Sequence, residues 1–300
     1  MVSNQKIILP LLEKKKVTLS IKREDLIHPQ ISGNKYRKLK YNLLKARELN
    51  YDTLLTFGGA YSNHIAATAY AGKLNNIKTI GVIRGEELRD SWTKNPTLSE
   101  AAKCGMKFKF LTREDYRKKE TKEFISNLKK EIGDFYIVPE GGTNSLAVKG
   151  CEEILSLKDA EYDIICCPVG TGGTIAGIIN SAATNQRVIG FPALKGDFLK
   201  KDICKFVQNG NWELCTNYHF GGYARVNESL VSFINEMKQN VGIPLDPVYT
   251  GKMMYGILDL IAKDFFKPKT KILATHTGGL QGIAGMNLYL KSKNLPIIDI

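Results

Sequence analysis

Short apolar runs alternate with helical segments along most of the chain. Between residues 51 and 140 the apolar runs are TLLTF, KTIGVIR, KFKFL and FYIVP, and the segments between them, including a long one from Arg113 to Gly133, have helical spacing. A second series contains YDIICCPVG, RVIGFPAL and KILATHTGG, again with helical segments between them. Strands joined by helical crossovers form parallel sheets that helices cover on both faces. The pattern therefore predicts an α/β protein.

Three of the loops that follow predicted strands are rich in glycine and hydroxyl groups. Their sequences are FGGAYSN, CPVGTGGT and HTGGLQG. Parallel sheets place their ligand sites beyond the carboxyl ends of the strands, in the loops that lead to the next helix. One such loop is ordinary packing, but three in one chain indicate a shared cleft for an anionic ligand.

The loop at residues 169–177, VGTGGTIAG, has the composition of a phosphate-binding loop. Gly170, Gly172 and Gly173 let backbone N–H groups converge, and Thr171 and Thr174 add hydroxyl donors where a helix begins. The segment lacks the GK[ST] ending of a nucleoside-triphosphate loop, and the next strand does not end with the acidic residue that would hold a nicotinamide ribose. A purely structural tight turn is the alternative.

The loop FGGAYSN leads into an alanine-rich helix. Ser62 has the position of an N-cap, and capping alone would explain it. Asn63 and His64 follow directly and supply further donors at a helix N-terminus, where a substrate carboxylate would be held well. A satisfied surface histidine is the alternative for His64.

A lysine lies in the expected first turn of another helix, where the helix dipole disfavours a cation. This residue is Lys35 in the segment ISGNKYRKLK, and Arg37, Lys38 and Lys40 follow it closely. A basic, solvated helix start would explain the segment. The alternative is a reactive amine, because nearby cations and the helix end both lower a lysine pKa toward the range in which it forms a Schiff base.

Composition and charge narrow the classes of partner. The chain has 300 residues, 43% of them apolar, which suffices for one large domain or two ordinary ones. The net charge is +13, but the basic residues are spread out and mostly interleaved with acidic ones, so we expect no nucleic-acid partner. We find no bilayer-spanning apolar window and no secretion signal, so we expect a cytoplasmic protein with no membrane partner. The six cysteines show no CxxC spacing, so we expect reduced thiols and no metal site.

Taken in order, these segments resemble the pyridoxal-phosphate enzymes of the tryptophan-synthase β-like fold, and within them the D-cysteine desulfhydrase and 1-aminocyclopropane-1-carboxylate deaminase group. The resemblance covers nearly the whole chain through KREDLIHPQISGNKYRKLKY, GGAYSNH, VGTGGT, FGGYARVNES and DPVYTGKMMYG. It implies two open, mostly parallel sheets flanked by helices. A larger cofactor domain would comprise residues 1–38 and 149–300, and a smaller inserted domain residues 39–148. It also implies pyridoxal 5′-phosphate as cofactor, a small amino-acid substrate and a homodimer.

The resemblance also gives roles to individual residues. Lys35 would carry the cofactor aldehyde and act as the base, Tyr249 would lie against the cofactor ring, and Tyr223 would be an active-site tyrosine that meets the substrate. Without the resemblance, Tyr249 is as readily explained by packing. The other residues expected at the site are Ser62, Asn63 and His64 at the substrate carboxylate, with Asn63 also beside the cofactor's 3′-oxygen, and Gly170, Thr171, Gly172, Gly173 and Thr174 around the phosphate.

Two positions separate the branches of the group. Where the deaminase branch typically has Glu and Leu, this chain has Thr250 and Thr277, and these hydroxyls resemble the desulfhydrase branch at the cofactor. The implied reaction is the α,β-elimination of D-cysteine to pyruvate, ammonia and sulfide. Two alternatives remain open: ring-opening deamination of 1-aminocyclopropane-1-carboxylate to 2-oxobutanoate and ammonia, and a non-catalytic pyridoxal-phosphate- or nucleotide-binding protein. The chain departs from the group by a shorter segment around ALKGDFLKK and by AYSNHIAATA in place of the usual QSNH segment.

Overall fold

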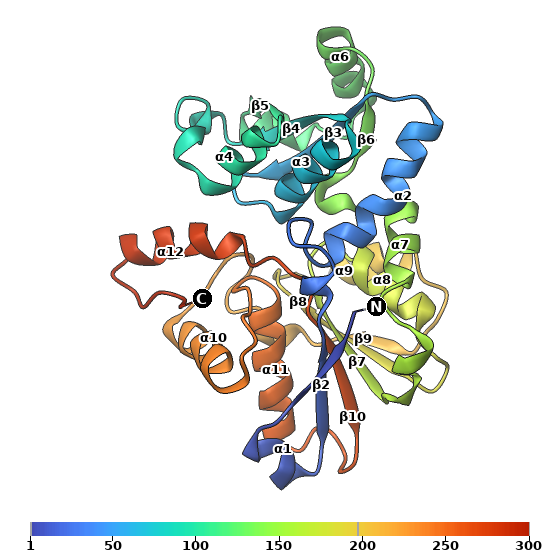
Figure 1. The fold of residues 1–300 in the computed structure, drawn as a ribbon, viewed down its shortest axis with the longest axis vertical. Coiled ribbons are helices and arrows are strands. Elements are labelled where there is room, and N and C mark those ends of the chain that lie inside the picture. The colour runs from blue at the N-terminus through green and yellow to red at the C-terminus, as the bar shows by residue number, and fades with distance from the viewer. Residues whose placement is uncertain (1, 197, 300) are drawn as a thin grey trace.

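The computed structural model contains two open sheets, each flanked by helices, and the predicted fold class is confirmed (Figure 1). It describes residues 2–196 and 198–299; Asp197, inside the segment expected to be shortened, lies outside the described residues. No helix in this part of the chain is long and apolar enough to cross a membrane.

The larger sheet has six strands in the order β1-β2-β10-β7-β8-β9. Their bounds are β1 (Asn4–Ile7), β2 (Thr18–Lys22), β10 (Lys271–Thr275), β7 (Ile164–Val169), β8 (Arg187–Pro192) and β9 (Trp212–Leu214). Every pair of neighbours is parallel except β1 and β2, which are antiparallel. The sequence pattern predicted β7, β8 and β10, which are apolar and mostly buried, and missed the other three.

The smaller sheet has four parallel strands in the order β5-β4-β3-β6, and all four were predicted. Their bounds are β3 (Thr53–Gly59), β4 (Lys78–Arg84), β5 (Lys107–Leu111) and β6 (Tyr136–Val138). Because β3 lies between two neighbours and is buried along its first six residues, the loop that follows it emerges at the middle of the sheet edge.

Helices cover both faces of the larger sheet and enclose an apolar core on each. One core involves α1 (Pro10–Lys15), α10 (Glu228–Val241), α11 (Thr250–Ala262) and α12 (Gly282–Ser292), and the other involves α7 (Ser145–Glu152), α8 (Gly173–Ser181) and α9 (Phe198–Cys204). The smaller sheet carries α3 (Asn63–Asn75), α4 (Pro96–Lys103), α5 (Arg113–Arg117) and α6 (Lys122–Ile132). Short 3-10 helices occur at Glu24–Leu26, Glu86–Leu88, Trp92–Lys94, Glu140–Gly142, Leu157–Glu161 and Thr216–Tyr218.

The long helix expected from Arg113 to Gly133 is two helices, so this prediction was wrong. Helix α5 ends at Arg117, and α6 begins after Thr121, whose hydroxyl accepts a hydrogen bond from the backbone N–H of Phe124. A threonine that can cap a helix favours a helix start over a helix interior.

Helices α2 (Asn34–Glu48) and α7 pack against each other between the two sheets (Figure 1). Leu39 and Ala46 of α2 belong to a core formed with the smaller sheet, whereas Cys151 of α7 belongs to a core of the larger sheet. The domain boundary expected after residue 38 falls inside α2, and the one expected after residue 148 falls inside α7.

Candidate active site

The first turn of α2 lies against the loop that follows β10. The backbone N–H of Asn34 donates to the carbonyl of Thr277 at 3.2 Å. Gly33, which precedes the helix at φ 66°, is so close to this loop that a Cβ there would lie 1.9 Å from the Thr277 carbonyl oxygen. Only glycine fits at this position, for reasons of both space and backbone conformation. The contact fixes where α2 begins and hence where Lys35 lies.

Lys35 is the second residue of α2 and is partly buried, with its Nζ 3.1 Å from Asn34 Oδ1. Burial lowers the pKa of this amine to about 7, and the positive charge of Lys38 lowers it further. We expected nearby cations and the helix end to lower the pKa; burial is the larger cause, and Lys38 is the cation that contributes. Arg37 and Lys40 instead pair with carboxylates, Arg37 with Glu24 and Glu153 and Lys40 with Glu153.

Lys38 connects two glycine-rich loops from different sheets. Its Nζ donates to the carbonyl of Gly141 at 2.9 Å and to the hydroxyl of Thr143 at 3.0 Å in the loop after β6, and to the hydroxyl of Thr171 at 3.4 Å in the loop after β7. Lys38 is only 2% exposed, and burial lowers its pKa. It pairs with no carboxylate among residues 2–196 and 198–299, so the buried cation has room for an anionic partner.

The predicted phosphate loop forms a cradle around this cation. A Cβ on Gly173 would lie 2.8 Å from Thr143 Oγ1 and 3.3 Å from Lys38 Nζ, so the glycine leaves the space open. Gly173 begins α8, and the Thr174 hydroxyl accepts from Asn34 Nδ2 at 2.8 Å. Backbone donors at a helix N-terminus, hydroxyls and a buried ammonium together fit a phosphate group.

Sequence reasoning missed Lys38 and the loop EGGTN (140–144) as parts of the site. Signals for both were present: the lysine lies one helical turn after Lys35 and on the same face, and EGGTN combines glycine and hydroxyl groups after a strand, as the three chosen loops do.

Ser62 and Asn63 lie where the predicted carboxylate-binding loop meets the larger sheet's loops. Ser62 caps α3, and its Oγ accepts from the backbone N–H groups of His64 at 3.2 Å and Ile65 at 3.3 Å. The side chain of Asn63 accepts from Gln281 Nε2, and a Cβ on Gly279 would lie 2.6 Å from Asn63 Nδ2. Asn63 therefore joins the smaller sheet to the loop after β10.

His64 is buried in the first turn of α3, so the alternative of a surface histidine is wrong. It is 1% exposed, and its Nε2 is 2.8 Å from Thr56 Oγ1. Because the Thr56 hydroxyl donates its proton to the carbonyl of Val138, Nε2 must be the donor to Thr56. Burial, with Lys35 and Lys38 nearby, lowers the His64 pKa well below its usual value, so the ring is neutral. Its Nδ1 has no hydrogen-bond partner in the described part of the chain.

Tyr249 and Tyr223 form an aromatic pair beside the phosphate loop. Their ring centroids are 6.2 Å apart with planes at 66°, and a Cβ on Gly170 would lie 3.0 Å from Tyr249 Cε1. Burial is the main cause that raises the pKa of both phenols, so both keep their protons near neutral pH. Each hydroxyl can therefore donate a hydrogen bond.

The two branch-marking threonines lie in different surroundings. Thr250 is fully buried at the start of α11, where its hydroxyl donates to Asp246 Oδ1 at 2.7 Å. Asp246 is itself buried and also accepts from the backbone N–H groups of Val248 and Tyr249, each at 2.9 Å. Thr277 lies against the first turn of α2 through its carbonyl, as described above. Sequence reasoning did not include Asp246 in the site, although an aspartate in such a turn can accept from the N–H groups that follow it.

Lys252 is a second buried lysine that sequence reasoning missed. Its Nζ donates to the carbonyls of His219 at 2.9 Å and Gly222 at 2.8 Å, in the loop that carries Tyr223. Burial lowers its pKa to about 8. Its position in GKMM, two residues after Thr250, gave no sign of these partners.

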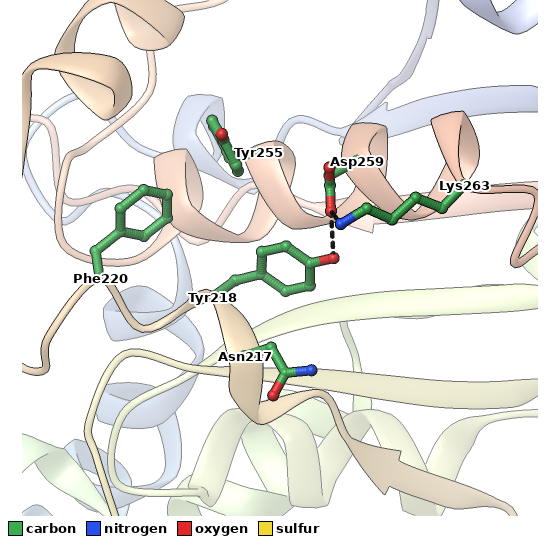
Figure 2. Close-up of a pocket in the computed structure, with 6 residues that line it drawn as sticks. All are labelled: Asn217, Tyr218, Phe220, Tyr255, Asp259 and Lys263. Carbon is green, nitrogen blue, oxygen red and sulfur yellow. Dashed lines mark hydrogen bonds and ion pairs between the residues drawn. The ribbon is translucent and has the colours of Figure 1, made fainter.

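A cavity of about 280 Å³ lies elsewhere on the larger sheet's side and contains none of the predicted site residues. Figure 2 shows its lining, in which Tyr218 Oη donates to Asp259 Oδ2 at 2.6 Å. Lys263 Nζ pairs with the same oxygen at 2.6 Å. Tyr218, Asp259 and Lys263 therefore pair with one another, and we do not include this cavity in the candidate active site.

A partly buried amine with a pKa of about 7, beside a cradle that fits a phosphate, is the arrangement required by an enzyme whose phosphate-bearing aldehyde cofactor binds a lysine. The chain matches the family model described as pyridoxal-phosphate dependent enzyme over residues 7–278, and it belongs to this family. Its cofactor is pyridoxal 5′-phosphate, as predicted.

Relatives carry the two names expected from the resemblance. The chain is 33% identical over 296 residues to a mitochondrial bifunctional D-cysteine desulfhydrase/1-aminocyclopropane-1-carboxylate deaminase from Arabidopsis thaliana, covering 88% of this chain and 73% of that protein. It is 25% identical to a D-cysteine desulfhydrase from Klebsiella pneumoniae, covering 90% of this chain and 89% of that protein. A crystal structure of an ACC deaminase homologue aligns with a TM-score of 0.84 and 28% identity, covering 97% of this chain and 93% of the other.

Proposed function

We propose that the protein is a lyase that eliminates the β-substituent of a small D-amino acid and converts D-cysteine to pyruvate, ammonia and sulfide. The observation that carries the proposal is the Lys35 amine, whose pKa of about 7 leaves it able to accept a proton near neutral pH. The cofactor, when bound, supplies the electron sink for the charge that develops at Cα.

The chain's own residues hold the reactants. Lys38, Gly173 and Thr174 would hold the cofactor's phosphate and Lys35 its aldehyde end, and the Lys35 amine takes the substrate's Cα proton. The donors at the N-terminus of α3, with Ser62 and Asn63, orient the substrate carboxylate. Tyr249 would lie against the cofactor ring.

We assign to Tyr223 the contact with the leaving sulfide. This tyrosine is 48% exposed and packs edge-to-face against the partly buried Tyr249. Its hydroxyl keeps its proton and can donate a hydrogen bond to a departing thiolate.

Deamination of 1-aminocyclopropane-1-carboxylate is the second candidate, because the Arabidopsis relative carries both activities in its name. That substrate has no Cα hydrogen and requires the cleavage of a carbon–carbon bond, whereas thiolate leaves readily from a modestly stabilised carbanion. The absence of a carboxylate at Thr250 favours the elimination.

Paired assays separate the two candidates. The purified protein, loaded with pyridoxal 5′-phosphate, is given D-cysteine, L-cysteine, D-serine or 1-aminocyclopropane-1-carboxylate. We expect sulfide and pyruvate from D-cysteine and little 2-oxobutanoate from 1-aminocyclopropane-1-carboxylate. Efficient deamination with no sulfide release would replace the first candidate by the second.

We also propose that residues 39–148 form the inserted smaller domain, that the protein acts in the cytoplasm and that it is a homodimer. All four strands of the smaller sheet lie within residues 53–138, which supports the insertion. Sedimentation of the purified protein tests the dimer, and a mass near that of one 33.5 kDa chain would contradict it.

A further inference from the structure

A cavity of about 570 Å³ lies beyond the carboxyl ends of the smaller sheet's strands. Its wall includes Gly59 and Ala60 after β3, Arg84 at the end of β4, and Tyr116 of α5. Gly59 and Arg84 are register partners at the ends of neighbouring strands. This is the edge at which open α/β sheets bind ligands, and the volume is that of a small-molecule site.

The cavity shares two loops with the active site. Gly59 and Ala60 belong to the loop that carries Ser62, and the backbone N–H of Ser62 donates to the carbonyl of Gly59 at 3.1 Å. A Cβ on Gly59 would lie 3.7 Å from an Arg84 guanidinium nitrogen, so the arginine lies against this loop. Glu140, also in the wall, directly precedes Gly141, whose carbonyl accepts from Lys38.

The lining is strongly cationic, with four basic side chains and two carboxylates. The carboxylates are used by two of the cations: Arg113 pairs with Glu87 at 2.7 Å and Lys119 with Glu140 at 3.3 Å. The remaining positive charge is therefore not balanced within the cavity.

Arg84 and Arg117 carry the unbalanced charge. Neither guanidinium makes an ion pair with any residue that the structure describes, although both line the cavity. The Arg84 Cζ lies 5.8 Å from the ring centre of Tyr116, so the arginine is held over an aromatic face. A guanidinium held in this way offers paired donors to a carboxylate or phosphate.

Tyr116 adds a buried donor without a partner. The residue is 3% exposed, and its hydroxyl makes no hydrogen bond in the described part of the chain. Leaving a buried hydroxyl unsatisfied is costly, so such groups normally meet a ligand or water. Burial and the Glu140 carboxylate raise the Tyr116 pKa, so the hydroxyl keeps its proton; Glu140 lies near the hydroxyl but outside hydrogen-bond geometry and pairs with Lys119 instead.

We propose that this cavity binds the anionic end of a small organic molecule, a carboxylate, phosphate or sulfonate, through Arg84, Arg117 and the Tyr116 hydroxyl. The anionic group has two possible sources. It is either the side chain of an amino acid whose α-carboxylate lies at Ser62, which rests on the proposed function, or a separate anion that binds beside the active site.

Titration calorimetry of the cofactor-loaded protein with inorganic phosphate tests the anion site itself, since the cofactor fills the phosphate cradle. We expect Arg84→Gln to weaken phosphate binding about tenfold or more, and Tyr116→Phe to weaken it by a smaller factor. The matched control is Arg89→Gln, which removes an exposed arginine that pairs with Glu86 outside the cavity. Equal phosphate affinity in the parent, Arg84→Gln and Arg89→Gln, or no binding to the parent, would overturn the proposal.

Kinetics with O-phospho-D-serine and D-serine identify the source. Elimination moves the Cα proton to Lys35 and breaks the Cβ–O bond, whose electron pair leaves with phosphate; water then converts the remaining aminoacrylate to pyruvate and ammonia. A tenfold rise of KM for O-phospho-D-serine alone in Arg84→Gln supports the side-chain source. An unchanged KM, with phosphate binding still weakened, supports the separate anion. If neither of these amino acids nor D-cysteine reacts, the proposed function fails while the phosphate titration still decides the cavity.

Discussion

The Thr250 hydroxyl donates to the buried Asp246 carboxylate at 2.7 Å, and the backbone N–H of Asp246 donates back to the same hydroxyl at 2.9 Å. Thr250 thus holds the turn from which Tyr249 reaches the phosphate loop. A glutamate at this position would bring a second carboxylate against Asp246 in a fully buried place, where like charges are costly. A neutral hydroxyl at position 250 is therefore better suited to the buried Asp246 carboxylate than a second carboxylate would be.

Thr250→Val should lower the free energy of unfolding by about 1–3 kcal/mol, because it leaves Asp246 and its N–H short of a partner at nearly constant volume. Thr250→Ser keeps the hydroxyl and is the control. Denaturant unfolding of both variants measures the difference, and equal stability would show that the hydrogen bond does not hold the turn.

The charge of Lys38 should lower the pKa of the Lys35 amine. Below pH 7 the Lys35 amine is protonated and cannot attack an aldehyde, so the rate at which the cofactor-free protein captures pyridoxal phosphate should rise with pH up to about 7 and then level off. Lys38→Met removes the charge that lowers this pKa, so the midpoint should move to higher pH. Lys40→Met, which removes an exposed lysine paired with Glu153, should leave it in place. A midpoint above 10 in the parent would contradict the assignment.

Gly173→Ala should weaken cofactor retention more than folding. Its Cβ would crowd Thr143 Oγ1 and Lys38 Nζ in the phosphate cradle, whereas Gly173 itself needs no left-handed backbone. Gly172 has a φ of 84°, so a substitution there would strain the fold as well and give a less clear result. Gly210→Ala, with nothing within 4 Å of the added Cβ, is the control. Unchanged cofactor affinity in Gly173→Ala would mean that the loop is only a turn.

Ser62→Ala should lower kcat/KM beyond what the lost helix cap explains. Removing an N-cap costs about 0.5–2 kcal/mol of stability. Thr121→Ala removes the comparable cap of α6, which is exposed and contains no predicted site residue. Both variants should therefore lose stability, but only Ser62→Ala should lose turnover. Equal turnover in the two would leave Ser62 as a cap alone.

The local sequence pattern was enough to predict an element or a cap when the interacting residues are close in sequence. The apolar runs predicted the strands β3, β7 and β10, which lie inside their sheets, and the Ser62 cap was predicted because its partners are the next few N–H groups. The strands that were missed, β1, β2 and β9, gave weaker signals because they are short or contain polar residues. Strand β2 contains the buried Lys22, which is stabilised by an ion pair with Asp159 at 2.7 Å, and nothing near Lys22 in sequence indicates that partner.

The site residues that were missed depend on distant partners. The sequence around Lys38 is typical of a solvent-exposed basic segment. The hydrogen-bond partners of this lysine lie more than a hundred residues away in two loops. Lys252 and the carbonyls it binds are likewise separated by at least 30 residues. His64 was placed at the right loop, but its burial under Thr56 and the Val138 carbonyl depends on the packing of the smaller sheet.

The most direct test of the central claim is to reduce the cofactor-loaded protein with borohydride and to locate the modified residue by mass spectrometry of peptides. We expect loss of the visible absorbance and a pyridoxyl-phosphate group on Lys35, because burial and the neighbouring Lys38 charge lower the pKa of its amine to about 7. Lys35→Ala should show neither the visible band nor turnover. A modification on Lys38, Lys252 or any other lysine, with Lys35 unmodified, would contradict the account.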